Sequence, residues 1–519
     1  MATGTGMDRA AAALFARDLV IAALPGPELG DDTVALLEDG CAGGVCLYGR
    51  SVVTPAQVRE LTDDVRRRIG PDALVTCDLE GGYVWRLKAP ATHWPSAMAF
   101  GAANRPDLTR RAAMLAAREM RAMGIDAPFA PVADVCDHPR NPVIGTRSFG
   151  GVASHVSRHV AASIGGYREG GVASCAKHFP GHGHTDVDSH HALPVVHHDD
   201  ERLDSVDLVP FVGAIRAGVD MVMVSHLLVN AIDRDLPASI SPAVVTGLLR
   251  QRLGLCGVIV TDALDMRAIT DTYGLAEASV RAIAAGCDMV AFNAPVESAR
   301  EVHRAITAAI ASGRLEWAQV RASVARVQAL RRSLSRNPRP PLTIVGDDSH
   351  TAVADEAAQL ALTATGDAMP LLSRAPGRTV VIEFDPRIPF TDPNVHAPEV
   401  RVADTIANRH AGTSAYVIAP TTWEAKQLEI LEAVHDATRV IVATRNAWRD
   451  DQQRRAMMAI ADRAHDVTVV ALRDPHDAGI LPGARNVISY ADDPSSTRAV
   501  TAWLLDGAPA PGTLPVALS

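Results

Sequence analysis

The sequence predicts a (β/α)₈ TIM-type barrel followed by a smaller α/β sandwich domain with a mostly parallel sheet. Short apolar runs of strand length alternate with helical stretches through the first two thirds of the chain. Eight such units fit into roughly 300 residues, which favours a closed barrel over the alternative, an open doubly wound sheet. A proline-rich break then precedes a second, shorter alternation of the same kind.

The barrel strands are expected where apolar runs are nearly continuous, as in GVIV and DMVMV, because parallel strands are buried on both faces. Glycine often ends the preceding helix, as in AIRAGVDMVMV. A helix with apolar residues at helical spacing is expected over residues 108–123. The eight expected strands span residues 20–24, 44–48, 73–77, 126–132, 172–177, 220–225, 257–261 and 288–292.

The break RRSLSRNPRPPLTIV at residues 331–345 is too rich in proline to continue a helix, and it predicts a linker. We therefore expect a catalytic-type barrel over residues 1–335, a linker over 336–346 and a C-terminal α/β domain over 347–519. Because the last domain has no GxGxxG and no P-loop, a structural or oligomerisation role is favoured for it. Its expected strands are 379–384, 415–419, 440–444, 467–472 and 487–490.

Composition excludes several classes of protein. Hydrophobic residues make up 47% and charged residues 21% of the 519 residues, as in an ordinary globular chain. The net charge of −10 and the 4% of aromatic residues argue against a nucleic-acid or anionic-membrane partner. The seven cysteines are expected to be buried, reduced thiols. The start of the chain shows no signal peptide, and no long apolar run predicts a membrane span, so a cytoplasmic location is expected.

Polar residues gather where the expected strands end, which in a closed barrel is the catalytic face. A single such residue is usually a cap or turn residue, but five successive strands with acids, bases or cations at the same end are harder to explain in that way. The residues concerned are Asp78 and Glu80, Asp134 and Arg147, Lys177 and His178, Ser225 and His226, and Asp262.

The loop over residues 177–194 is the richest in chemistry, with five histidines and two aspartates among glycines and prolines. Asp188 and His190 are two residues apart, so in an extended loop both point to one side. A carboxylate beside an imidazole fixes its tautomer and raises its basicity, which suits a general acid/base, although a surface Asp–His hydrogen bond has the same pattern. A metal site is a weaker alternative, because the histidines follow no known ligand spacing.

Asp262 ends an otherwise apolar run, where its carboxylate would face the barrel mouth as a nucleophile. The alternative is a helix cap, a role that Asp265 would fill equally well.

The segments DLEGGYVWRL, NPVIGTRSFG, KHFPGHGHTDVDSHHALP and VIVTDALDM together resemble glycoside hydrolase family 3, in its β-N-acetylglucosaminidase branch. The resemblance covers the barrel and extends weakly into the second domain through ATRNAW and ALRDPHDAGILP. It implies a retaining mechanism in which Asp262 attacks the anomeric carbon, His190 is the acid/base and Asp188 orients His190. The positions that it implies for sugar binding are Asp78, Arg86, Arg147, Lys177 and His178.

Two residues depart from the family pattern: His184 replaces an acidic residue, and Tyr83 replaces an arginine. The implied substrate is a saccharide with a terminal β-linked N-acetylglucosamine, from muropeptides or chitin, with no cofactor and no metal. The branch also admits inorganic phosphate as acceptor. A neutral His190 would not repel this anion, and Lys177, Arg147, His178, His182 and His184 are expected to make the site locally positive. The alternatives are a β-glucosidase or broad β-hexosaminidase, a non-catalytic sugar-binding protein and a metal-dependent hydrolase. The oligomeric state is left open.

Overall fold

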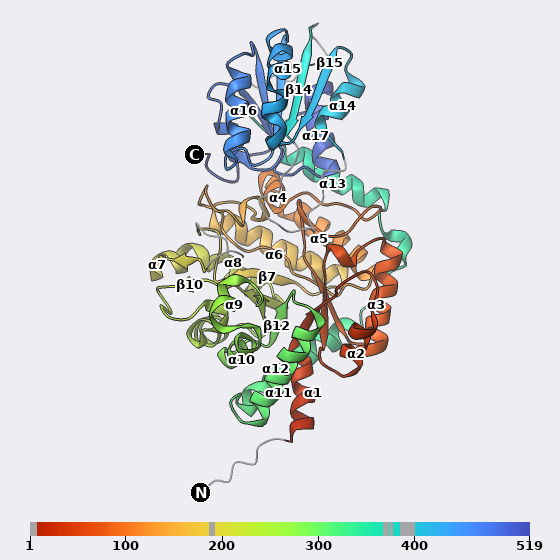
Figure 1. The fold of residues 1–519 in the computed structure, drawn as a ribbon, viewed down its shortest axis with the longest axis vertical. Helices are drawn as coiled ribbons and strands as arrows, with labels where there is room; N and C mark the ends of the chain where they lie inside the picture. Colours follow the sequence, from red (N-terminus) through yellow and green to blue (C-terminus); the bar gives the residue numbers. More distant parts are fainter. Residues whose placement is uncertain (1–7, 186–192, 367–371, 373–376, 385–399, 519) are drawn as a thin grey trace.

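The computed structural model describes residues 8–185, 193–366, 372, 377–384 and 400–518. Asp188 and His190 therefore lie outside the described residues. Figure 1 shows two bodies stacked along the long axis, with the barrel below and the blue C-terminal domain above. The predicted fold class is confirmed in both bodies.

The barrel sheet has the strand order β6-β3-β2-β1-β12-β11-β9-β7, and all its paired strands are parallel. The ring closes beyond β6, where Val132 forms a parallel bridge with Lys177 and the amide of Cys175 donates to the carbonyl of Ala130 over 2.7 Å. Each strand coincides with one of the eight apolar runs in the sequence. They are β1 (Val20–Ala23), β2 (Gly44–Leu47), β3 (Leu74–Cys77), β6 (Ala127–Pro128), β7 (Cys175–Phe179), β9 (Met221–Val224), β11 (Val258–Ala263) and β12 (Met289–Phe292).

Helices surround the sheet and bury their apolar stripes against it. On α5, Leu108, Ala112 and Ala116 recur at helical spacing and are buried, as the sequence predicts. The main barrel helices are α1 (Arg9–Asp18), α2 (Asp31–Glu38), α3 (Pro55–Ile69), α4 (Ala97–Ala103), α5 (Pro106–Ala122), α6 (Ala153–Gly170), α8 (Val209–Arg216), α9 (Arg267–Tyr273), α10 (Leu275–Ala285), α11 (Val296–Ala311) and α12 (Trp317–Ser335).

The second body is a sheet of order β13-β18-β17-β16-β14-β15 between two helical layers. Only β13 pairs antiparallel. One layer, α15 and α16, packs on Val380 and Val442, and the other, α14 and α17, packs on Val381 and Val470. The elements are α13 (Asp348–Ala361), β13 (Thr363–Thr365), β14 (Thr379–Phe384), α14 (Val402–Arg409), β15 (Thr413–Ile418), α15 (Trp423–His435), β16 (Arg439–Thr444), α16 (Asp451–Ala461), β17 (Val467–Ala471), β18 (Arg485–Ile488) and α17 (Pro494–Asp506).

The two bodies share one buried cluster at the catalytic end of the barrel. Met98 of α4 and Ile144 of the barrel pack with Ile488 and Tyr490 of the second domain. The Ser96 hydroxyl donates to the carbonyl of Tyr490 over 2.9 Å. Since this contact is apolar and buried, the second domain is held against the face on which the site residues gather (Figure 1).

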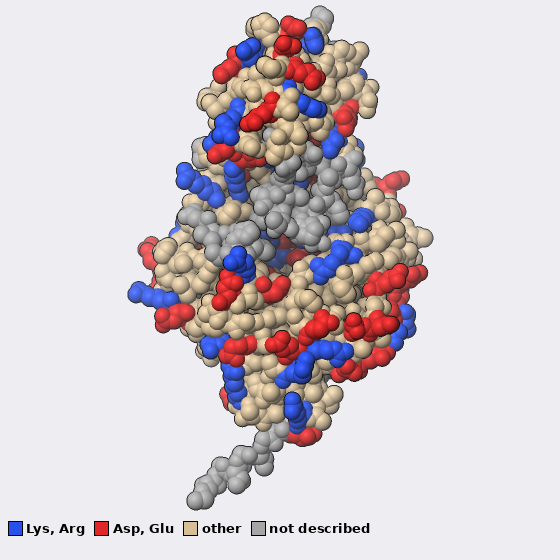
Figure 2. Space-filling view, viewed as in Figure 1, with Lys and Arg blue, Asp and Glu red and all other residues tan. Residues whose placement is uncertain are grey.

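Surface charge is mixed on both bodies. On the face shown in Figure 2, lysine and arginine side chains are interspersed with aspartate and glutamate, and no broad area of one sign is visible among the described residues. None of the described helices has the length and apolar character needed to cross a bilayer.

Candidate active site

Two β-bulges lie at the catalytic end of the barrel. Between Ala176 and Phe179, β7 advances three residues while β9 advances two. Between Val260 and Ala263, β11 advances three residues while β12 advances two. A bulge turns the side chains that follow it and ends regular pairing. The first bulge carries Lys177 and His178, joined by a cis peptide bond, and the second carries Asp262.

Lys177 joins two carboxylates at the centre of the site. Its Nζ lies 2.7 Å from Oδ1 of Asp78 and 2.6 Å from Oε1 of Glu80. Burial alone would lower the pKa of Lys177, but Asp78 and Glu80 outweigh burial and raise it above its ordinary value. The lysine is therefore a fixed cation, and it holds Asp78 at the mouth, where that side chain is 26% exposed.

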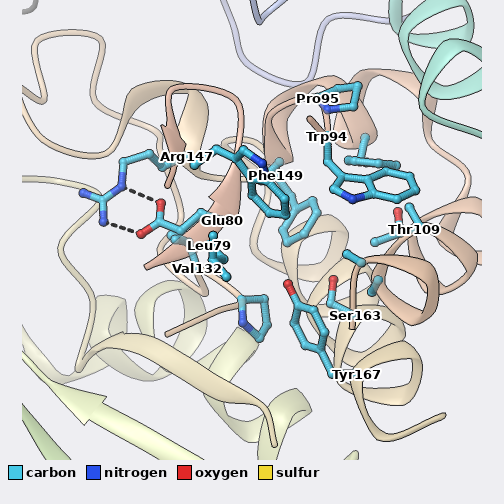
Figure 3. A pocket seen from close by; sticks show the side chains of 17 residues that line it. Leu79, Glu80, Trp94, Pro95, Thr109, Val132, Arg147, Phe149, Ser163 and Tyr167 are labelled. Atoms are coloured by element: carbon cyan, nitrogen blue, oxygen red, sulfur yellow. Dashed lines mark hydrogen bonds and ion pairs between the residues drawn. The ribbon is translucent and has the colours of Figure 1, made fainter. Parts of the chain in front are cut away.

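Arg147 forms an ion pair with Glu80. Its Nε and Nη2 each donate to the Glu80 carboxylate over 2.8 Å, which is the bidentate geometry that Figure 3 shows. Burial would raise the pKa of Glu80, but Arg147 and Lys177 hold it well below its ordinary range. Glu80 thus remains ionised and fixes both cations.

The loop that presents Glu80 depends on glycine. Gly81 has a φ of +97°, and a Cβ there would lie 2.4 Å from the carbonyl oxygen of Pro95. Behind Glu80 is a cavity of about 50 Å³ whose walls include Trp94, Phe149 and Tyr167 (Figure 3). This largely apolar backing keeps water away from the ion pair and strengthens it.

His178 is held as one tautomer. Arg147 donates to its Nε2 over 3.1 Å, so that nitrogen accepts, and its Nδ1 donates to Oδ2 of Asp134 over 2.7 Å. Asp134 also accepts the backbone N–H of His182 over 2.6 Å. Burial would raise the pKa of Asp134, but His178 and the hydrogen bonds lower it. The result is an imidazole held in a fixed orientation.

His182 is the second buried imidazole of the loop. Burial is the main cause that lowers its pKa to about 4, and the charges of Asp134 and Asp262 offset this only in part. Its Nδ1 lies 2.8 Å from the Thr185 hydroxyl. His182 is therefore neutral near pH 7 and lies within electrostatic reach of Asp262.

Asp262 is half-buried at the end of β11. Its Oδ1 accepts the N–H of Ala263 over 2.8 Å, which fixes one carboxylate oxygen. Asp262 is not the N-cap of α9, the helix that follows it, because Met266 occupies that position. Asp265, the other cap candidate, instead accepts the amide N–H of Asn293 over 2.7 Å.

The structure brings together most of the binding residues named from the sequence. Asp78, Lys177, Arg147 and His178 form one connected network through Glu80. Arg86 is buried, with 5% exposure. Burial raises the pKa of the nearby Cys46 and Cys77 thiols, and the charge of Arg86 offsets part of that rise.

Sequence reasoning gave no role to Glu80 or Asp134, although it noted both as polar residues after strands. Both side chains are at most 2% exposed, and each holds a cation or an imidazole in place. Among the described residues, the cations expected to make the site locally positive are paired with buried carboxylates. Asp78, Glu80 and Asp134 offset Lys177 and Arg147, and His182, whose pKa is lowered to about 4, is uncharged near pH 7.

His184 and Tyr83, the two residues that depart from the family pattern, lie in different surroundings. The Nδ1 of His184 lies 2.7 Å from Oδ1 of Asp137, which also pairs with Arg202. The guanidinium of Arg473, from the second domain, lies 5.2 Å from the ring centroid of Tyr83. The second domain therefore contributes a cation beside the site.

All seven cysteines are free, but Cys256 is exposed, which corrects the expectation that every thiol is buried. Among the described residues, no group of three or more His, Cys, Asp or Glu side chains could hold a metal ion.

Comparison with known proteins settles the family. The model of the glycosyl hydrolase family 3 N-terminal domain matches residues 18–330. The chain belongs to glycosyl hydrolase family 3. This confirms the resemblance drawn from the motifs and makes the chain a glycoside hydrolase.

A solved family 3 β-N-acetylglucosaminidase from a Paenibacillus strain is 33% identical, with a TM-score of 0.92 over 98% of both chains. A β-hexosaminidase from Chromobacterium violaceum is 38% identical over 262 residues, which cover 49% of this chain and 73% of that protein. β-Hexosaminidase A from Pseudoalteromonas piscicida is 31% identical over 351 residues, 62% of this chain and 59% of that protein. This chain thus spans less than two thirds of the Pseudoalteromonas protein.

Proposed function

We propose that this chain is a cytoplasmic, retaining exo-β-N-acetylglucosaminidase that removes terminal β-linked N-acetylglucosamine from muropeptide or chitin-derived fragments. The observation that carries the proposal is the network in which Glu80 fixes Lys177 and Arg147 on the barrel face that also bears Asp262. The names of the relatives support the N-acetylated sugar.

The proposed reaction has two steps. In the first, a carboxylate oxygen of Asp262 bonds to the anomeric carbon as the glycosidic C–O bond breaks, and His190 gives its proton to the leaving oxygen. In the second, water attacks the anomeric carbon, its proton passes to His190, and the bond to Asp262 breaks. Asp188 orients His190 and stabilises its protonated form. The roles of Asp188 and His190 rest on the DSH motif alone.

Sugar recognition is proposed for Asp78, Arg86, Arg147, Lys177 and His178. A carboxylate and a guanidinium can each form paired hydrogen bonds with neighbouring hydroxyls. The Asp78 side chain is partly exposed, and its Oδ1 lies 2.7 Å from Nζ of Lys177. The Asp78 carboxylate is therefore already oriented when a sugar binds. The sugar then encounters a fixed set of donors and acceptors, and little side-chain entropy is lost on binding.

The test of substrate compares nitrophenyl β-N-acetylglucosaminide with nitrophenyl β-glucoside. The proposal predicts a much higher kcat/KM for the acetylated sugar and free N-acetylglucosamine as product. Equal values would support the rival broad β-hexosaminidase or β-glucosidase, and no turnover of either would support a non-catalytic sugar-binding protein.

The test of the dyad varies the leaving group. General acid help is worth roughly 10²–10⁴-fold, and a dinitrophenolate leaves without it. The variant His190→Ala should therefore lose far less kcat/KM with the dinitrophenyl donor than with a natural glycoside, and Asp188→Ala should show a smaller loss of the same kind. Equal losses with both donors would make His190 a binding residue.

We also propose that inorganic phosphate competes with water in the second step. A carboxylate acid/base about 4 Å from one negative charge would cost about 4 kcal/mol at an effective dielectric of about 20, and a neutral His190 avoids this cost. The charge balance around Lys177 and Arg147 gives phosphate no added attraction, so the proposal rests on His190 alone. Turnover with millimolar phosphate should yield N-acetylglucosamine 1-phosphate by NMR, and free sugar alone would show a plain hydrolase.

A further inference from the structure

His226 lies behind Asp262 and has no part in the proposed chemistry. It follows β9, the strand between the two bulged strands, and its side chain is fully buried. Its Nε2 lies 3.0 Å from the carbonyl oxygen of Ala263, the residue that follows Asp262. Its Nδ1 lies 2.8 Å from the Ser239 hydroxyl, which is also buried.

These two contacts define the state of the ring. A carbonyl oxygen only accepts, so the Nε2 of His226 carries the proton and donates to Ala263. In the neutral ring Nδ1 then has no proton and accepts from the Ser239 hydroxyl. The chain of hydrogen bonds thus runs from Ser239 through His226 to the carbonyl of Ala263, the residue after Asp262.

Ala263 is the residue of the bulge that orients Asp262. The N–H of Ala263 donates to Oδ1 of Asp262 over 2.8 Å, and the carbonyl of Ala263 also accepts the N–H of Met266 over 3.1 Å. On the other side of the bulge, the Thr261 hydroxyl accepts the N–H of Ala291 over 3.1 Å. Because a bulge interrupts the ladder, side chains supply the hydrogen bonds that hold its shape.

We infer that His226 is a positioning residue that locks the β11 bulge and thereby aims the Asp262 carboxylate at the anomeric carbon, with Ser239 fixing the tautomer. The inference rests on the proposed role of Asp262. The carbonyl and the N–H of Ala263 belong to adjacent peptide groups that meet at its Cα. Without the hydrogen bond to the carbonyl, the Ala263 backbone is held less firmly, and the N–H that donates to Oδ1 of Asp262 shifts with that backbone. A displacement of about 1 Å in a reacting group costs about 10²-fold in rate.

The experiment measures kcat/KM with dinitrophenyl β-N-acetylglucosaminide, which reports the attack by Asp262 because this leaving group needs no acid. Rates are divided by the concentration of active sites, titrated with a 5-fluoro N-acetylglucosaminyl donor. His226→Phe keeps a ring but removes the donor, and it should lower kcat/KM about 10²-fold while the inhibition constant of free N-acetylglucosamine stays within about twofold.

Two further variants keep the test decisive if His226→Phe does not fold. His226→Gln offers an amide N–H near the Nε2 position and should recover kcat/KM to within about tenfold of the parent. Ser239→Ala should lower kcat/KM about tenfold, because the ring is no longer held in one tautomer. The matched control is Ser241→Ala, which removes a buried hydroxyl that donates to Asp233 over 2.6 Å, away from Ala263, and should change kcat/KM by less than about twofold.

The outcomes separate the inference from the proposed function. If His226→Phe and Ser239→Ala lower only the melting temperature and keep the parental kcat/KM for each active site, His226 is merely structural and the inference is overturned. If the parent enzyme is not labelled at Asp262, the proposed nucleophile fails instead. A loss confined to the inhibition constant of N-acetylglucosamine would also overturn the inference, because it would place His226 in sugar binding.

Discussion

Replacing Glu80 by glutamine should destabilise the barrel and disable the site together. The Glu80 side chain is 2% exposed and accepts from Lys177 over 2.6 Å and from two nitrogens of Arg147 over 2.8 Å each. Glutamine keeps the size of the side chain but removes its charge, and its amide N–H groups face other donors. Two cations then remain buried around a neutral group.

The magnitude follows from burial. Removing one partner of a buried ion pair typically costs about 3–5 kcal/mol, and about 2–4 °C of melting temperature accompanies each kcal/mol in a large domain. Glu80→Gln should therefore melt about 10 °C below the parent at neutral pH. Its kcat/KM for nitrophenyl β-N-acetylglucosaminide should fall by about 10²-fold or more, because Lys177 and Arg147 lose their anchor.

The matched control is Glu277→Gln. Glu277 also pairs with two cations, Arg281 over 2.8 Å and Arg314 over 2.5 Å, but its side chain is 36% exposed. Exposed pairs contribute less than about 1 kcal/mol, so this variant should melt within about 3 °C of the parent. Thermal unfolding by circular dichroism checks both. If Glu80→Gln melts no lower than Glu277→Gln, the claim that Glu80 is the anchor of the site is refuted.

Three further predictions concern pH, thiols and metal. Burial, and then Asp474, raise the pKa of Asp477 to about 7 from 3.8, so its stabilising proton is lost as pH rises through about 7. Because the same carboxyl titrates near 3.8 in the unfolded chain, this stability falls between about pH 4 and about pH 7. Asp477→Asn, which can still accept the Trp448 amide, should therefore exceed the parent in melting temperature by more at about pH 8.5 than at about pH 4, and a pH-independent difference would contradict this. A thiol reagent should modify one cysteine, Cys256, in the native protein and all seven after unfolding, whereas several rapid native reactions would mean that the barrel opens. Chelators should leave turnover of the nitrophenyl sugar unchanged, and a loss restored by added zinc would support the metal-dependent alternative.

The fold follows from local patterns in this sequence. The apolar run around Val260 favours a strand buried on both faces, which the structure shows, and the glycines after helices indicate the turns. The sequence predicts three site residues, Asp262, Lys177 and Arg147, because each lies at or beyond the end of such a run and matches a family motif.

What the sequence could not predict depends on contacts between distant segments. Glu80 looks no different from Asp78 in the sequence, and only the geometry shows that it holds both Arg147 and Lys177. The two bulges arise from register against neighbouring strands, which no local pattern records. The approach of Arg473 to Tyr83 joins two domains and was equally inaccessible. The sequence also does not show that Lys177 and Arg147 are paired with a buried carboxylate.

We propose that Asp262 forms a covalent bond to N-acetylglucosamine during turnover. The most direct measurement is mass spectrometry of the protein after reaction with a 5-fluoro N-acetylglucosaminyl donor, followed by peptide mapping. We predict one sugar for each chain, attached to the peptide VIVTDALDM at Asp262, and no adduct on Asp262→Asn. A label on another carboxylate, or rapid turnover of a good donor with no adduct at any time, would contradict it.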